Sequence, residues 1–224
     1  MAGRMSKLSP RFAFALPLLF AAAPALAQTT DVKEDSVVLQ PDKVTDDAPV
    51  VETLAEANLP DWSANNAKAL LAFIGNVGAE GLFPKDYNPD GLQAAIAGGD
   101  QARLDKVATD SFLLLATHMR DGRTPNAARK QWFMTDNDAE QTPLIALLTS
   151  ALLSNSVPEA LLGLDPVHPD FAALKAALAV AKTPADANAI RVNMERWRWM
   201  PRDLGSGYVV SNVPEYLTRV VHDG

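Results

Sequence analysis

Between Asp61 and Met200, apolar side chains recur at steps of three and four residues, and prolines and glycines divide the chain into short segments. This spacing places the apolar residues of a segment on one face of an α-helix, whereas a half-buried strand would alternate at every second residue. The clearest segment begins after Asp100, which we expect to cap it, and closes at Asp121-Gly122. The chain is therefore predicted to be mainly α, a multi-helix domain.

Prolines, glycines and capping side chains set the expected ends of the helices. The first is capped by Asp61 and closed by Gly78 and Gly81, and a short second one follows the turn Asn88-Pro89-Asp90. The others are expected at residues 100–121, 143–154, 157–162, 169–182 and 184–200, with a polar stretch at 123–141 that holds the apolar island 132–134.

The pattern changes after Gly205-Ser206-Gly207, where two segments of β-branched and aromatic composition, 208–210 and 217–221, flank a turn at 212–215. A C-terminal β-hairpin is predicted here. An isolated hairpin is marginally stable, and Asp223-Gly224 is a turn signal that predicts a further strand. We therefore expect residues 204–224 to be the start of a β-rich domain that is incomplete in this sequence.

The amino-terminal 27 residues have the order of a secretory signal: Arg4, Lys7 and Arg11, an apolar run from Phe12, and Ala25-Leu26-Ala27. The apolar run is too short to span a bilayer, so we expect cleavage after Ala27, export to the periplasm and no transmembrane span in the mature chain. Residues 28–50 are acidic and poor in aromatic side chains, which predicts a disordered tether. The helical domain is then expected at residues 51–203.

Composition excludes several kinds of site. The sequence has no cysteine, so thiolate metal sites, disulfides and a cysteine nucleophile are excluded from these 224 residues. The histidines are His118, His168 and His222, with no pair at helical ligand spacing, and we expect no metal and no cofactor. A formal charge of -7 argues against a nucleic-acid partner.

Two of the four tryptophans and two arginines lie within residues 193–201. On a helix, Glu195 can reach Trp199, and the tryptophans occupy different faces. Glu195 could be a general acid or base in an aromatic pocket, but we favour a structural interpretation, in which the tryptophans are packing anchors and the arginines lie over aromatic rings or pair with acids. The residues of this junction motif are Asn193, Glu195, Arg196, Trp197, Arg198 and Trp199.

Other polar residues also receive structural interpretations. We expect the His168 ring to satisfy a backbone group near a helix start, and Asp86-Tyr87 to anchor a loop. Arg120 and Arg123 are placed to meet the negative end of a helix, with contact to stem-peptide carboxylates as the weaker alternative.

The run 193–201, followed by 202–205 and 208–214, resembles the junction between scaffold and catalytic domains in large periplasmic L,D-transpeptidases. Segments 80–87, 118–123 and 164–169 are similar to other parts of the same scaffold. The resemblance covers roughly residues 59–224 and implies crosslinking of peptidoglycan stems by a catalytic cysteine, assisted by histidine, in a domain after the scaffold. No cysteine and no Ser-His-Gly-Cys motif is present, so no catalytic residue carries over to this chain.

The leading hypothesis is a non-catalytic scaffold portion of a periplasmic L,D-transpeptidase, inactive alone, with peptidoglycan or the missing catalytic domain as partner. A truncated reading frame, a fragment or a natural split would each explain this. The alternative is a stand-alone periplasmic binding or regulatory module for peptidoglycan or a wall enzyme. An independent carboxylate-based hydrolase is disfavoured, because the sequence marks out no acid pair.

Overall fold

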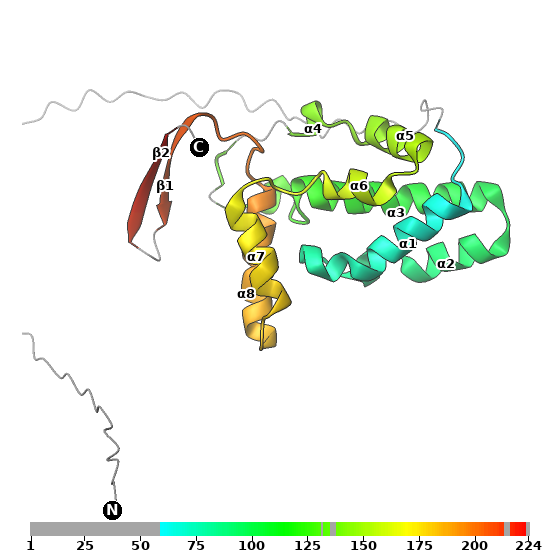
Figure 1. Cartoon of the computed structure of the whole chain (residues 1–224), viewed down its shortest axis with the longest axis horizontal. Helices are drawn as coiled ribbons and strands as arrows, with labels where there is room; N and C mark the ends of the chain where they lie inside the picture. The colour runs from blue at the N-terminus through cyan, green and yellow to red at the C-terminus, as the bar shows by residue number, and fades with distance from the viewer. Residues whose placement is uncertain (1–58, 131, 135–137, 213–215, 223–224) are drawn as a thin grey trace, which may run out of the picture. The chain divides into compact units, whose positions relative to one another are not determined.

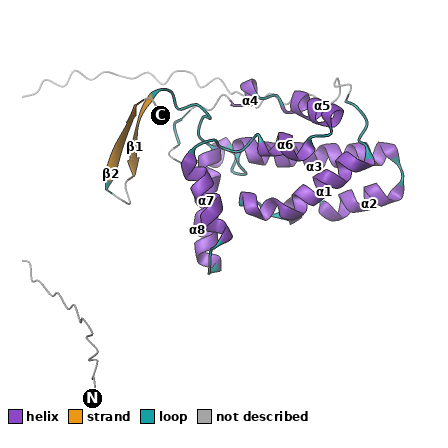
Figure 2. Ribbon diagram, in the orientation of Figure 1, coloured by secondary structure: helices purple, strands orange, loops and turns teal. Residues whose placement is uncertain are grey.

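The computed structural model describes residues 59–130, 132–134, 138–212 and 216–222. The predicted signal peptide, the acidic tether and the turn residues 213–215 lie outside the described residues. The helices are α1 (Ala64–Asn76), α2 (Pro89–Gly98), α3 (Gln101–Asp121), α4 (Asp138–Gln141), α5 (Leu144–Ser154), α6 (Val157–Leu162), α7 (Pro169–Ala179) and α8 (Pro184–Arg198). The strands are β1 (Gly207–Asn212) and β2 (Leu217–His222), so the mainly α fold with a C-terminal hairpin is confirmed (Figures 1 and 2).

The core forms where α1, α2, α3, α5 and α6 pack against one another. The 21-residue α3 is the longest helix and contributes Phe112, Leu115 and Met119, all fully buried. Its buried positions recur at three and four residues, which is why one face enters the core while Lys106 remains exposed. Buried partners from the other helices are Leu70, Ile74, Leu92, Leu148 and Leu161.

Local capping explains most helix ends. The carboxylate of Asp100 accepts from the Arg103 N–H at the start of α3, as predicted, and the Asn88 side chain does the same for Gly91 at the start of α2. The predicted end of 169–182 is wrong, since α7 stops at Ala179. The helix ends early because its last turn tightens, with Val180 and Ala181 donating to the carbonyls of Ala177 and Leu178 three residues back.

The predicted cap of the first helix is also wrong. Asp61 precedes the helix by three residues, and Ser63 is the N-cap, accepting from the Asn66 N–H at 3.1 Å. The chain is held extended there because Trp62 is tied to α3: its backbone N–H donates to Asp105 Oδ1 at 2.8 Å and its indole N–H to Thr109 Oγ1 at 3.0 Å.

The last two helices, α7 and α8, lie side by side and run across the direction of α3 (Figure 1). α8 ends at Arg198, slightly before the predicted Met200. The difference arises because the last turn tightens: Trp199 and Met200 donate to carbonyls three residues back, and Pro201 then prevents the helix from continuing. The end of α8 reaches the C-terminus of α3, where Glu195 contacts the residues after Gly122.

The hairpin is antiparallel, and its register pairs Tyr208 with Val221 and Val209 with Val220. Val209 and Val220 are 63% and 76% exposed, so one face presents a bare valine pair. Within the ranges given above, no helix is both long enough and apolar enough to cross a bilayer.

Candidate functional site

The junction motif lies on the last turns of α8 and on Trp199, the residue that directly follows this helix. The structure brings Glu195, Trp197, Arg198 and Trp199 into contact with other elements, whereas Asn193 and Arg196 are exposed. Asn193 bonds back to the Ala189 carbonyl, and its own oxygen accepts from Arg196. The motif therefore divides into a packed side and a solvent side.

Glu195 holds the loop that follows α3. Its Oε1 accepts from the backbone N–H groups of Arg123 and Thr124 at 2.7 and 2.8 Å, and from the Trp199 indole at 3.1 Å. These donors are satisfied by one carboxylate oxygen, which leaves Glu195 fixed rather than poised to move a proton. The general acid or base interpretation gains nothing from this geometry.

Glycine is required where the loop passes this carboxylate. Gly122 has φ +82°, and a Cβ there would lie 2.8 Å from both Glu195 Oε1 and Trp199 Nε1. A side chain would displace the carboxylate and strain the backbone.

The two tryptophans anchor different elements. Trp199 meets Trp132 edge to face with centroids 5.4 Å apart, and the Arg129 guanidinium lies over its ring at 5.1 Å. Trp197 stacks on His168, with centroids 4.3 Å apart and planes 20° apart. Both tryptophans therefore pack against residues of other elements.

Arg198 is 1% exposed, the most buried charged side chain among the described residues. Its Nη2 donates to the Glu80 carbonyl at 2.7 Å, and its guanidinium lies 5.2 Å over Phe171. Burial lowers the pKa of Arg198, and nearby Asp165 opposes that change. An arginine this deep joins α8 to α7 and to the turn after α1.

Lys175 joins two carboxylates beside Arg198. Its ammonium lies 2.6 Å from Glu80 Oε2 and 2.8 Å from Asp165 Oδ2. Burial raises the pKa of Glu80, with a further rise from neighbouring Asp165, while Lys175 lowers it. For Lys175 burial opposes the charge, but the two acids outweigh it and raise its pKa. No sequence signal marked this pair of carboxylates. Lys175 and Arg198 together balance its charge, with Arg198 Nη2 lying 3.8 Å from Asp165 Oδ1.

A further junction residue, Arg202, was missed by sequence reasoning. Its Nη2 donates to the carbonyls of Arg120 at 2.6 Å and Leu164 at 2.8 Å, which pins the segment after α8 to the C-terminus of α3. An arginine directly after a helix-ending Pro201 is the signal that could have suggested it, since cations favour carbonyl-rich helix ends.

The side chains of Asp86, Tyr87 and Arg120 have partners within the helical domain. Tyr87 is fully buried with its hydroxyl 3.1 Å from His118 Nδ1, and Asp86 pairs with Arg123 at 2.6 Å. Burial raises the pKa of Tyr87 above its ordinary value and lowers that of His118, which favours the neutral form of each. The prediction of Asp86-Tyr87 as a loop anchor is confirmed. Arg120 pairs with Asp121 and donates to the Thr142 carbonyl.

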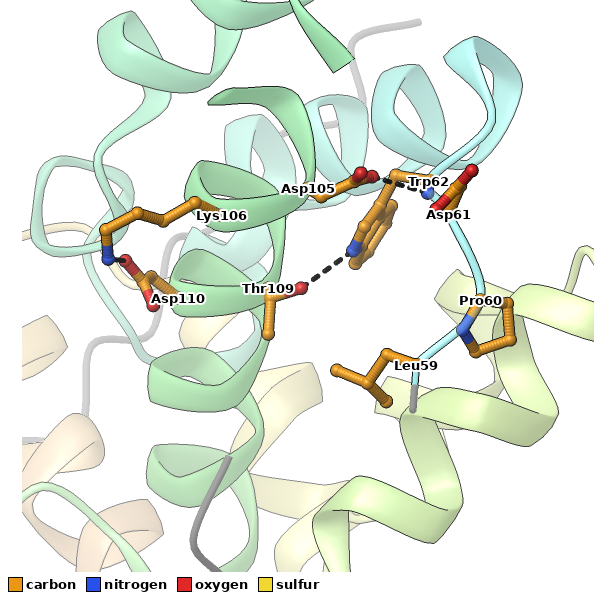
Figure 3. A pocket seen from close by; sticks show the side chains of 8 residues that line it. All are labelled: Leu59, Pro60, Asp61, Trp62, Asp105, Lys106, Thr109 and Asp110. Carbon is orange, nitrogen blue, oxygen red and sulfur yellow. Dashed lines mark hydrogen bonds and ion pairs between the residues drawn. The ribbon is translucent and has the colours of Figure 1, made fainter. Parts of the chain in front are cut away.

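A hollow of about 280 Å³ lies between the segment before α1 and one side of α3 (Figure 3). Its polar groups are largely engaged: Asp105 and Thr109 hold Trp62, and Lys106 pairs with Asp110 at 2.8 Å. The hollow therefore marks where the chain is fastened to α3. A smaller one, of about 140 Å³, is bordered by His168, Trp197, Arg202 and Tyr208.

Comparison with known families decides the identity of the helical part. Residues 55–178, more than half of the chain, match the family described as the Scaffold domain, the scaffold of L,D-transpeptidases. The chain belongs to the scaffold-domain family. No curated protein and no solved structure matches it significantly.

The scaffold-domain match ends within α7, so α8, Arg202 and the hairpin lie beyond it. The contacts of Glu195, Trp197, Arg198 and Arg202 therefore tie the segment beyond the match back onto the scaffold domain. The role of the motif as a junction between domains remains a prediction.

Across the described part of the chain, no three histidine, cysteine or acidic side chains gather where they could hold a metal ion. Glu80 and Asp165 border neither hollow described above. The arrangement is suited to holding elements in place.

Proposed function

We propose that this chain is the non-catalytic scaffold portion of a periplasmic L,D-transpeptidase and takes part in peptidoglycan crosslinking by holding a catalytic domain at the β1–β2 hairpin. The family match supports a scaffold role in an L,D-transpeptidase-like protein. The periplasmic location, the role in peptidoglycan crosslinking and attachment of the catalytic domain at the hairpin are parts of this proposal.

The exposed face of the hairpin supports it as the attachment point. The hairpin has a valine pair, Val209 and Val220, exposed on one face, and the junction motif fastens the preceding segment to the scaffold. A two-stranded sheet with a bare apolar pair is marginal alone and gains stability when further strands or a second layer cover it. A β-rich catalytic domain that continues from this hairpin would supply that cover.

The amino-acid composition indicates which domain would supply the catalytic group. The sequence has no cysteine, so a transpeptidase that uses a cysteine thiolate must take this group from a domain other than the 224 residues given. The scaffold's part is then to position that domain.

The experiment joins an L,D-transpeptidase catalytic domain after Gly224 and measures crosslinking of tetrapeptide stems by mass spectrometry of muropeptides. The fusion should crosslink stems and form a carbapenem adduct, whereas the unfused chain should do neither. The negative control is a fusion in which the catalytic cysteine of the added domain is replaced by alanine.

A matched pair of variants tests the hairpin. Val209→Lys should lower crosslinking by the fusion, because it places a charge on the face to be covered. Val180→Lys, at a valine 73% exposed after α7, should leave it unchanged. Crosslinking by the unfused chain would contradict the proposal by showing that this chain is itself catalytic. Equal activity of both variants would also contradict it and would favour a stand-alone binding module.

Export is tested separately. The mature protein recovered from the periplasm should begin at Gln28, as amino-terminal sequencing would show. An uncleaved chain held in the membrane would contradict the periplasmic assignment.

A further inference from the structure

The segment between α8 and β1 has one fixed part and one glycine-rich part. Arg202 anchors the first part through the carbonyls of Arg120 and Leu164. Beyond it come Gly205, at φ +79°, and Gly207 at the start of β1. Glycines permit many backbone conformations, so a hairpin attached only through this segment could pivot.

Tyr208 supplies a second attachment on the far side of the glycines. Its hydroxyl lies 3.2 Å from His168 Nε2. The His168 ring is itself held, because its Nδ1 accepts from the Asp170 N–H and its face stacks on Trp197. With Nδ1 as an acceptor, the proton of the neutral ring resides on Nε2, which donates to the Tyr208 hydroxyl.

The burial pattern of the hairpin agrees with contact at this point. Among the hairpin side chains whose exposure the structure describes, Tyr208 and Val221 are half-buried and the others are exposed. These two residues are cross-strand partners. The second rung of the hairpin, counted from α8, is therefore the least exposed of those described.

We propose that Tyr208, His168 and Trp197 form a latch that holds the hairpin in one orientation on the helical domain. Two anchors on opposite sides of Gly205, the latch and Arg202, remove the pivot that one anchor would leave. Resting on the proposed function, the latch would set the orientation of the catalytic domain, so Tyr208 and His168 are positioning residues.

The latch can be measured in the mature chain alone. The absence of native cysteine lets spin labels attach only at Val220→Cys on the hairpin and Leu153→Cys on α5, both highly exposed positions. Double electron–electron resonance then gives the distribution of distances between them. Tyr208→Phe removes only the hydroxyl, and His168→Asn removes the latch while keeping a side chain that can cap α7. Tyr216→Phe, at a tyrosine 93% exposed, is the matched control.

Loss of one neutral hydrogen bond should lower the ratio of latched to unlatched molecules about fivefold. A broader distance distribution is expected for Tyr208→Phe and for His168→Asn, no further change in the double variant, and none in Tyr216→Phe. An unchanged helical circular dichroism signal would show that the domain itself is intact. Distributions as narrow as the parent's in both latch variants, or equal broadening by the control, would overturn the latch. Because the assay needs no transpeptidase, the latch and the proposed function can fail separately.

Discussion

Gly122 illustrates how one residue lets α8 approach α3. Its φ of +82° and ψ of 172° lie in a region that glycine alone occupies readily, and the space for a Cβ is filled by Glu195 and Trp199. Gly99 has φ +70° but nothing within 4 Å of its would-be Cβ. Gly122 therefore combines a glycine-only backbone conformation with a steric conflict, whereas Gly99, with ψ 6°, lies in the left-handed region that other residues can enter.

Gly122→Ala should lower the free energy of unfolding by about 3 kcal/mol, from backbone strain together with displacement of the Glu195 carboxylate. Gly99→Ala should cost only about 1 kcal/mol, the strain alone. Urea unfolding followed by circular dichroism measures both. Equal losses would show that neither the glycine-only conformation of Gly122 nor its contact with Glu195 adds to the cost.

His118 should make stability depend on pH. Burial lowers its pKa in the folded chain below the ordinary 6.5, so in this window the unfolded chain binds more protons. Stability from this group is complete above pH 6.5 and falls as pH drops toward the lowered pKa of the folded state.

His118→Asn keeps an oxygen that can accept from Tyr87 but cannot titrate. The difference in unfolding free energy between parent and variant should therefore shift with pH below 6.5, in the direction that weakens the parent. Comparing the two chains cancels the opposite contribution of Glu80, whose raised pKa favours the fold at low pH. Parallel pH profiles would contradict the assignment.

At the scale of elements, helix ends here depend on single side chains. The start of α1 is set by Ser63, whose hydroxyl accepts from Asn66, and Asp61 makes no such bond in the segment held against α3. The last turns of α8 depend instead on contacts with distant parts of the chain, through Glu195 and Arg198.

Ser63→Ala should lower the free energy of unfolding by about 1 kcal/mol, the usual cost of a lost N-cap. Asp61→Ala should change it by less than about 0.5 kcal/mol, because the residue lies outside the helix. Thermal or urea unfolding of the two variants gives the comparison. A larger loss from Asp61→Ala would restore Asp61 as the cap.

At the scale of the whole molecule, the helical domain and the hairpin differ in how they are stabilised. The helical core buries large side chains such as Phe112 and Trp62, whereas most described side chains of the hairpin are exposed. The fold of the helices should therefore not depend on the strands.

A mature chain ending at Asp203, without the hairpin, should keep its helical circular dichroism and unfold cooperatively, with a loss of less than about 2 kcal/mol for the Tyr208 contacts. Calorimetry of the two chains tests this. Loss of the cooperative transition would show that the hairpin is part of the helical core.

Local interactions explain what was predictable from sequence. Asp100 and Asn88 cap helices through bonds to N–H groups three residues away, so their roles follow from the neighbouring sequence. The mainly α fold follows likewise from the period of the apolar residues, and the hairpin from the β-branched and aromatic composition of its two segments. The junction motif was recognisable because its residue types are unusual, and Glu195 reaching Trp199 is a contact across one helical turn.

Only the tertiary structure decided which partners those residues have. Glu195 binds the backbone of residues 71 and 72 positions away, and Arg198 donates to a carbonyl 118 positions away. No local pattern specifies such separations, because they depend on how whole helices pack. The same reason displaced the start of α1: a cap at Asp61 was locally reasonable, but the bonds from Trp62 to α3 hold the chain extended until Ser63.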